Sequence, residues 1–323
     1  MAALSSEAGV AVSGENEPSG MSAYAATLLM ISALIFSTGA LFVRKLDHPH
    51  PWTSVFWRSV SASASLALLI LWRERSNALR AIVRVGRPGL SVGAAFSAAS
   101  IALVVALAHS SVAVVLVIFA LGPLAAALLA WLMLGERVHN YTWVAIAVTV
   151  GGVVFMVSGS GATTSVVGVA IAFVMPVSVG FGTVTIRKHS NIEMLPAMLL
   201  AAVISAFVAV PFAHPLQVTR HDLIMLGLFG FAQLGIGLAI FSIGAPLAPV
   251  TDVALISMLE PIMGPIWVWI FVSEYPGASA LIGGAVVFVA LAAHTIYPRL
   301  QVSHGNAHSL RPGDAAHLEL VDE

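Results

Sequence analysis

Residues 254–274, ALISMLEPIMGPIWVWIFVSE, decide the class of this protein. About 20 mostly apolar residues cross a bilayer as a helix, so this stretch predicts one membrane span. Glu260 lies near its middle, and Pro261 follows at once. A charged acid at that depth costs roughly 2.5–3.5 kcal/mol to insert, which makes it a candidate functional group. Pro261 and Pro265 also remove helix donors, and the freed carbonyls are tolerated only against protein or a wet cavity. We therefore expect this helix to line a polar path.

The rest of the chain is similarly apolar. Of its 323 residues, 59% are hydrophobic and 9% are charged, whereas soluble domains carry about 25% charged residues. This composition predicts an all-α polytopic membrane protein. The net charge of −1 offers no basic surface, so no nucleic-acid partner is expected. Cysteine is absent, which excludes disulfides and thiol chemistry.

Apolar runs between charged or Gly/Pro breaks predict ten transmembrane helices, because roughly 20 apolar residues suffice for each. They are 23–43, 53–72, 89–108, 112–134, 142–158, 165–186, 192–212, 222–244, 250–273 and 277–297. The short links leave no room for a soluble domain. Polar sequences at the two ends, 1–20 and 299–323, are predicted to be disordered tails.

The distribution of basic residues predicts how the chain is oriented. If the N-terminus is inside, ten of the 14 Lys and Arg residues fall in inner loops and tails and three in outer loops. The remaining one, Arg58, lies within the second span. Because cytoplasmic loops are enriched in Lys and Arg, both termini are predicted to be cytoplasmic in an inner or plasma membrane.

Residues 254–274 are similar to an earlier stretch of the chain. Residues 116–136, LVIFALGPLAAALLAWLMLGE, align with 254–274 at an offset of 138. The aligned identities include Pro123 with Pro261, Trp131 with Trp269, and Glu136 with Glu274. A second similarity, at an offset of 143, aligns Gly39, Arg44 and Lys45 with Gly182, Arg187 and Lys188.

These two similarities divide the chain into two repeats of five spans, 21–160 and 161–298. An odd number of spans turns the second repeat over in the membrane. Inverted repeats of this kind are the plan of many secondary transporters, whose substrate site lies near the midplane between the halves.

At these residues the chain resembles the EamA-type transporters of the drug/metabolite transporter superfamily. The resemblance rests on LGPLAAALLAWLMLGERV, on LEPIMGPIWVWIFVSEYP and on VFWRS at the second span. It covers 21–298 and implies ten helices in two repeats and export of small organic solutes. Members handle amino acids, other metabolites and drugs, so the resemblance leaves the substrate open.

The residues that do not repeat are the strongest site candidates. Glu260 aligns with Gly122, and Arg58 aligns with about Ala201, so each charge occurs in one half alone. A residue that only supports the fold should recur in both halves. We expect Glu260 to face the cavity, where it can exchange a proton. Arg58 is its natural partner, or the partner of a substrate carboxylate; the alternative is that Arg58 snorkels to the outer surface.

Four further residues complete the predicted substrate-binding set. Ser257 and Trp267 share a helical face with Glu260, while Ser37 and Gln233 lie in the first and eighth spans. For Ser37 and Gln233 the competing interpretation is packing between helices. Glu136 and Glu274 recur, so we interpret them as architectural residues that cap helices or pair with loop cations. No catalytic residue, metal site or cofactor is predicted.

Three functions remain open on the sequence alone. The favoured one is a secondary transporter that exports a small organic solute by alternating access, without direct use of ATP because no Walker motif is present. A membrane enzyme is disfavoured because HExxH and GxSxG motifs are missing. A lipid flippase or a regulatory membrane subunit could use the same fold. The expected partners are a small molecule and the bilayer, with protons as an open second ligand; the oligomeric state is not predicted.

Overall fold

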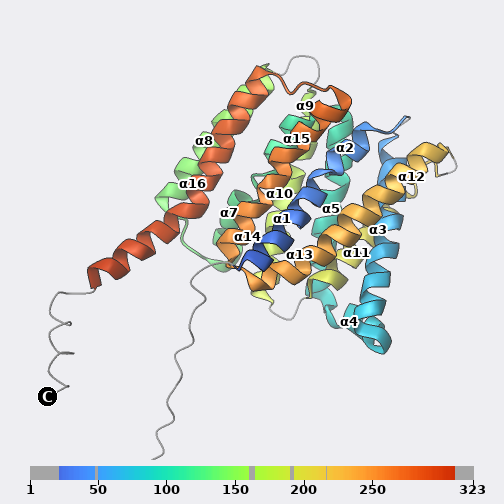
Figure 1. Cartoon of the computed structure of the whole chain (residues 1–323), viewed down its shortest axis with the longest axis horizontal. Coiled ribbons are helices and arrows are strands. Elements are labelled where there is room, and N and C mark those ends of the chain that lie inside the picture. Colours follow the sequence, from blue (N-terminus) through green and yellow to red (C-terminus); the bar gives the residue numbers. More distant parts are fainter. Residues whose placement is uncertain (1–21, 48–49, 160–163, 190–192, 216, 310–323) are drawn as a thin grey trace, which may run out of the picture.

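A computed structural model describes residues 22–47, 50–159, 164–189, 193–215 and 217–309. Every regular element within these ranges is helical (Figure 1). The first half contains α1 (Ala23–Ser37), α2 (Gly39–Arg44), α3 (Pro51–Glu74), η1 (Arg75–Asn77), α4 (Ala78–Arg84), α5 (Gly86–His109), α6 (Val112–Phe119), α7 (Gly122–Leu134) and α8 (Asn140–Gly159).

The second half follows the same plan. It contains α9 (Val166–Ala172), α10 (Val174–Lys188), α11 (Met194–Ala209), α12 (Arg220–Leu228), the π-helix η3 (Phe229–Gly237), α13 (Leu238–Gly244), η4 (Ala245–Leu247), α14 (Val250–Ser257), α15 (Leu259–Val272) and α16 (Ala278–Ser309).

Nine helical stretches of the described chain are long and apolar enough to cross a membrane. They are Ala23–Arg44, Pro51–Glu74, Gly86–His109, Val112–Leu134, Asn140–Gly159, Val166–Lys188, Arg220–Leu247, Asp252–Val272 and Ala278–Tyr297. The remaining predicted span, 192–212, corresponds to α11, a shorter apolar helix of 16 residues. The prediction of an all-helical, multi-pass membrane protein is confirmed.

Three spans are interrupted where a proline removes a backbone donor. α6 ends at Phe119, α9 at Ala172 and α14 at Ser257. Each of these residues stands four positions before a proline, namely Pro123, Pro176 and Pro261. Proline cannot donate to the carbonyl four residues earlier, so one helix ends there and a second begins within three residues.

The first span is interrupted without a proline. Between α1 and α2, the Ser37 hydroxyl donates to the Leu34 carbonyl (2.7 Å) and the Thr38 hydroxyl donates to the Ile35 carbonyl (2.6 Å). Such bonds from side chains compete with the helix ladder and commonly bend it. The interruptions thus fall in the first and fourth spans of each repeat.

The bundle has two ends, which we name by the arginines found there. At the Arg44 end, the amide of Ser165 before α9 donates to the carbonyl of His109, the last residue of α5 (3.1 Å). From that point Val166–Lys188 runs 23 residues, about 35 Å at 1.5 Å per residue, to the Arg187 end. α3 likewise leads from the Arg44 end to α4 at the opposite end (Figure 1).

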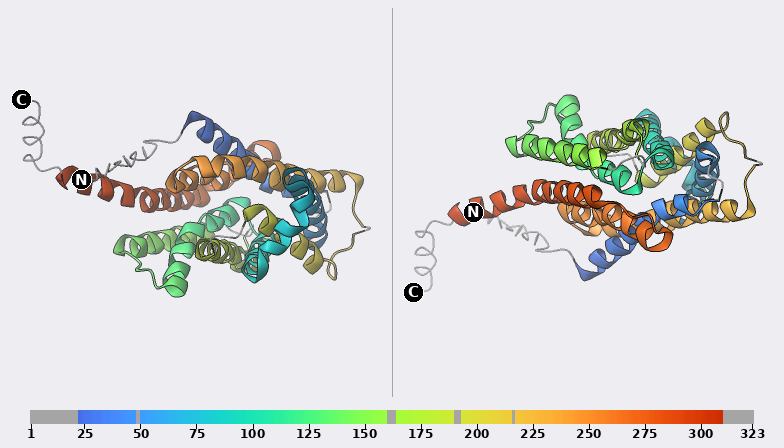
Figure 2. Two further views of the ribbon diagram at one scale, coloured as in Figure 1. Left: turned by 90° about the horizontal axis from the view of Figure 1, so that it is seen from below. Right: turned by 90° about the horizontal axis from the view of Figure 1, so that it is seen from above.

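The helices form two layers when the bundle is viewed from above or below (Figure 2). One layer contains α1, α15 and α16, and the other contains α5, α7, α8 and α10. α8 packs against α16, and α3 packs against α11 and η3. Buried side chains at the Arg44 end, among them Val55, Val104 and Leu107, belong to the largest apolar core.

The C-terminal helix is longer than predicted. α16 continues to Ser309, so the predicted boundary of the tail at 298 falls inside a helix. Extending an existing helix adds one hydrogen bond per residue without a new nucleation step, which allows this overrun. Residues 1–20 and 310–323 of the predicted tails lie outside the described residues.

Candidate functional site

A cavity of about 260 Å³ lies between the two halves of the bundle. Its wall is mostly apolar, with four phenylalanines and three methionines: Phe36, Phe96, Phe119, Phe241, Met175, Met194 and Met198. Six polar or charged residues also line it: Arg58, Ser59, Ser100, Gln233, Ser257 and Glu260. A mostly apolar wall with a few placed polar groups is typical of a small-molecule site.

Arg58, on α3, points inward and is only 3% exposed. Its Nη1 donates to the Ser100 hydroxyl (2.5 Å) and its Nη2 donates to the side-chain oxygen Oε1 of Gln233 (3.4 Å). The guanidinium lies over the Phe229 ring, 4.3 Å from the centroid, and its Nε has no hydrogen-bond partner among the described residues. The structure therefore excludes the alternative in which Arg58 snorkels to the surface.

Gln233 connects Arg58 to the first span. It lies in η3, is buried, and its Nε2 donates to the Phe36 carbonyl (2.7 Å) near the end of α1. π-Helical turns are rare and often occur at functional sites, because they displace a side chain from the regular helical register. Gly230 in the same element permits close packing on α3, since a Cβ there would meet the Ala62 amide nitrogen at 2.7 Å.

Glu260 occupies the second position of α15 and, like Arg58, lines the cavity. It is half-buried, and no described residue donates a hydrogen bond to its carboxylate. The interruption at Met258 places Glu260 in the first turn of a new helix, where the helix dipole stabilises a negative charge. This is a physical reason for a carboxylate at this depth: it lies at a helix N-terminus beside a cavity.

Arg58 and Glu260 do not form an ion pair within 4.0 Å. Each therefore keeps hydrogen-bonding capacity that no described residue fills: the buried Arg58 Nε and both Glu260 oxygens. The cavity presents one positive and one negative group to whatever enters it.

The other predicted residues divide into two groups. Ser257 lines the cavity, with its hydroxyl donating to the Val253 carbonyl one turn earlier (2.8 Å). Trp267 and Ser37 do not line it; the Trp267 indole donates to the Ser37 hydroxyl (2.8 Å) where α15 meets α1. We expected both residues in the cavity, but they form a contact between α15 and α1 instead. Trp267 lies nearly two turns beyond Glu260 along α15.

Sequence reasoning missed two residues that hold Arg58. Ser100 receives its hydrogen bond and Phe229 lies beneath its guanidinium. Phe229 precedes Gln233 by four residues, and this spacing could have indicated that both face α3. Ser100 lies in a run of small residues, FSAASIA, in which nothing distinguishes it from its neighbours.

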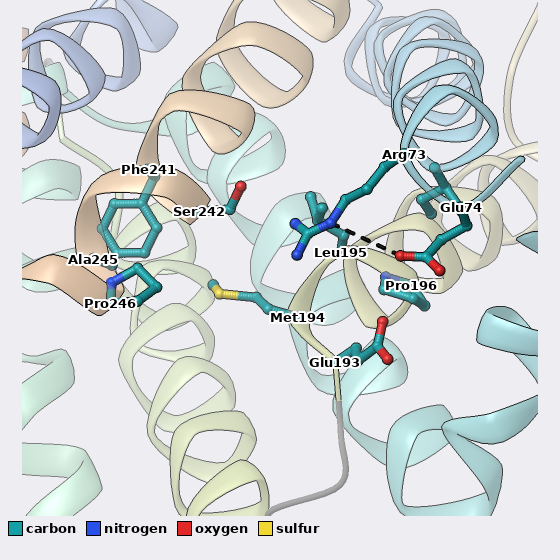
Figure 3. A pocket seen from close by; sticks show the side chains of 11 residues that line it. Arg73, Glu74, Glu193, Met194, Leu195, Pro196, Phe241, Ser242, Ala245 and Pro246 are labelled. Carbon is teal, nitrogen blue, oxygen red and sulfur yellow. Dashed lines mark ion pairs between the residues drawn. The ribbon is translucent and has the colours of Figure 1, made fainter.

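A second pocket, of about 300 Å³, opens at the Arg187 end, between α3, α11 and α13 (Figure 3). Arg73 and Glu74 point toward one another there, with 3.8 Å between Nε and Oε1, and Glu193 lies nearby (Figure 3). Met194 and Phe241 line both this pocket and the central cavity. The pocket is thus a charged mouth adjoining the cavity.

The model of the EamA-like transporter family matches residues 23–158 and 166–295, once for each repeat. This chain belongs to the EamA-like transporter family. EamA-like proteins are membrane transporters, which agrees with the apolar helices and with the cavity between the two halves.

A solved structure titled "Crystal structure of protein" shares the fold of this EamA-like chain. The TM-score is 0.62 at 18% sequence identity, and the alignment covers 86% of this chain and 98% of that one. No curated protein matches the sequence.

Proposed function

We propose that this EamA-like protein is a secondary transporter that exports a small organic solute, such as an amino acid or a related metabolite, by alternating access. The observation that carries this proposal is the pair of opposite charges, Arg58 and Glu260, on the walls of one small cavity without a bond between them. A solute with both a carboxylate and an ammonium group would satisfy both.

The cavity wall supports a zwitterion with an apolar side chain. Arg58 is held by Ser100 and Gln233, so its guanidinium is already oriented for a carboxylate. Glu260 would receive the ammonium group. The phenylalanine and methionine side chains of the wall would then surround the rest of the solute, and methionine adapts readily to different shapes.

The size of the cavity favours a solute over a lipid. About 260 Å³ lies just below the usual size of ligand sites, which typically measure about 300–1,000 Å³. A phospholipid with two acyl chains needs far more room. A flippase or regulatory subunit remains the alternative, and it would not require two opposite charges in one small cavity.

Alternating access requires two halves that can move against each other. We propose ten spans, with α11 as the seventh, in two inverted repeats with both termini in the cytoplasm of an inner or plasma membrane. Recurring features at the 138 offset support the repeats. α7 and α15 both begin after a proline-dependent break, and both end at a left-handed cap, Gly135 (φ 71°) and Ser273 (φ 59°).

Proton coupling is the proposed role of Glu260 beyond binding. A carboxylate inside the membrane without a hydrogen-bond donor among the described residues is suited to carry a proton when no solute is bound. Protonation would remove the charge that the empty cavity otherwise leaves uncompensated.

The test is solute uptake or counterflow in proteoliposomes, with radiolabelled leucine, phenylalanine and methionine as probes. We expect at least one probe to be transported, with Arg58→Lys reducing transport at least about tenfold because lysine cannot present the bidentate fork of arginine. The matched control is Arg137→Lys, an exposed residue in the link after α7. Transport of labelled phospholipid without transport of any amino acid would favour the alternative.

A further inference from the structure

Two ion pairs join the two halves of the bundle in a reciprocal arrangement. Arg44 pairs with Glu274 (Nε–Oε2, 2.6 Å), and Arg187 pairs with Glu136 (Nη2–Oε1, 2.8 Å). The repeats align Arg44 with Arg187 and Glu136 with Glu274. Each half therefore supplies an arginine to the glutamate of the other half, as a twofold relation between the halves requires.

The two pairs lie at opposite ends of the bundle. Arg44 ends α2, whereas Arg187 lies at the end of α10, across the whole 23-residue stretch that starts at the Arg44 end (Figure 1). The central cavity lies between them. The pairs are thus positioned to control access from either side.

The pair at the Arg44 end is docked, by which we mean that its side chains also form hydrogen bonds with the neighbouring backbone. Arg44 binds both carboxylate oxygens of Glu274 and also donates to the carbonyls of Leu107 (2.7 Å) and Ser110 (2.8 Å). The amide of Val112, at the start of α6, donates to Glu274 Oε1 (3.3 Å). The two side chains are 23% and 31% exposed. Charge-assisted bonds of this kind, partly shielded from water, are the strong ones.

The pair at the Arg187 end lacks such bonds to the backbone among the described residues. Its side chains are 57% and 46% exposed, and within the described residues Arg187 and Glu136 form one hydrogen bond, with each other. Exposed pairs of this kind contribute little to the stability of a conformation. The two ends therefore differ although their sequences correspond.

A comparison of the two repeats identifies the backbone contacts that the Arg187–Glu136 pair lacks. A shift of 138 places Leu107, Ser110 and Val112 on Ala245, Ala248 and Val250. The correspondence holds in the structure, because α14 begins at Val250 as α6 begins at Val112. Neither Arg187 nor Glu136 bonds to this 245–250 link in the described structure.

The asymmetry of the pairs agrees with the asymmetry of the cavity. At the docked end, Val55, Val104 and Leu107 form part of the buried apolar core. At the Arg187 end, Met194 and Phe241 adjoin the charged mouth. The better-docked pair thus marks the end that is closed.

We infer that Arg44–Glu274 and Arg187–Glu136 are two alternating locks, each closing its own end of the cavity when it docks on the link between the third and fourth spans of a repeat. This inference rests on the proposed alternating-access function. In the conformation shown, the Arg44 lock is docked on residues 107–112. In the opposite conformation, the Arg187 lock docks on residues 245–250 and the Arg44 lock releases.

The absence of cysteine allows a direct test with single reporter cysteines in the purified full-length protein in detergent. Val55→Cys reports on the closed end, because Val55 is 1% exposed. Met156→Cys, on α8 and 0% exposed, reports on general loosening of the fold. The readout is the rate at which a water-soluble maleimide labels the single thiol in each variant.

Arg44→Gln, or the isosteric Glu274→Gln if the first folds poorly, should raise the labelling rate of the Val55→Cys reporter about tenfold, the size of an ordinary conformational coupling. Labelling of the Met156→Cys reporter should stay slow. The matched controls are Arg187→Gln and Glu136→Gln, which remove the same bond at the other end. They should leave labelling at position 55 unchanged or slower, because they destabilise the opposite conformation.

Three results would overturn the inference: no increase in labelling at position 55 with either Arg44→Gln or Glu274→Gln, an equal increase with Arg187→Gln, or a parallel increase at position 156. The assay requires no solute. A protein that labels as expected but transports nothing would contradict the proposed function and not the locks, whereas transport without the labelling change would contradict the locks alone.

Discussion

Glu260 owes its environment to the residue that follows it. Pro261 ends the preceding helix at Ser257, so the carboxylate lies in the first turn of α15 rather than in the middle of a continuous helix. The positive end of the helix dipole and the cavity together reduce the cost of a charge at this depth. Arg58 is stabilised differently, by Ser100, Gln233 and the Phe229 ring.

Glu260→Gln should reduce net transport at least about tenfold while the melting temperature stays within a few degrees of the unsubstituted protein. Glutamine keeps the size and hydrogen bonding of glutamate but loses its charge and its exchangeable proton. Transport and thermal unfolding should be measured on the same preparation. Asp47→Asn, which neutralises an exposed carboxylate, is the control and should leave transport intact.

Solute exchange distinguishes the two roles proposed for Glu260. If the carboxylate carries the proton, Glu260→Gln should still catalyse exchange of solute for solute. If it binds the ammonium group, net transport and exchange should both be lost. Full activity in both assays would remove Glu260 from the site.

Four membrane spans are interrupted helices. Three of the four interruptions begin four residues before a proline, and the fourth occurs where Ser37 and Thr38 donate to their own helix. In both repeats they affect the first and fourth spans. Half-helices of this kind place helix ends and free carbonyls at membrane depth, which is where transporters build their sites.

Pro261→Ala should restore a donor for the Ser257 carbonyl and favour a continuous helix through Met258. Proline inside a helix costs about 3 kcal/mol relative to alanine, so this substitution should leave stability unchanged or raise it. Transport should nevertheless fall, because Glu260 would leave its helix N-terminus. Transport rate and melting temperature are the measurements.

Pro265→Ala provides the matched comparison within the same helix. Pro265 lies inside α15 without ending it. Its replacement should therefore preserve transport. Equal losses in the two alanine variants would show that the interruption at Met258 has no special role.

The whole molecule consists of two repeats that exchange ion pairs, with the cavity between them. The docked pair is at the Arg44 end and the charged mouth at the Arg187 end. The basic residues that favour a cytoplasmic position lie at the same end as the mouth, in the stretch from Arg73 to Arg87. If this end faces the cytoplasm, as we propose, the mouth opens on the side from which an exporter would load its solute.

A single cysteine at Asn77, an exposed position in η1, tests this orientation. In intact cells an impermeant maleimide should leave it unlabelled, and labelling should appear once the membrane is permeabilised. Tyr275→Cys, at an exposed residue just beyond α15 at the opposite end, should be labelled in intact cells. The reverse pattern would place both termini outside.

The sequence by itself determined the membrane class, the positions of most helices and the repeat, and it singled out Glu260 beside Pro261 as a candidate site residue. These features depend on composition, on apolar run length and on one missing amide, all of which are local along the chain. The family follows from the same motifs, because Pro, Trp and Glu recur in both halves at the 138 offset.

Only the tertiary structure decided which side chains meet. Arg58 could have snorkelled outward, and its inward position depends on Ser100 and Phe229, which are 42 and 171 residues away along the chain. Trp267 shares the expected helix with Glu260 but meets Ser37 instead of the cavity, since the choice of neighbour depends on how α15 crosses α1. The pairing of each arginine with the glutamate of the other repeat likewise arises when the two halves pack, because no local pattern specifies contacts between distant helices.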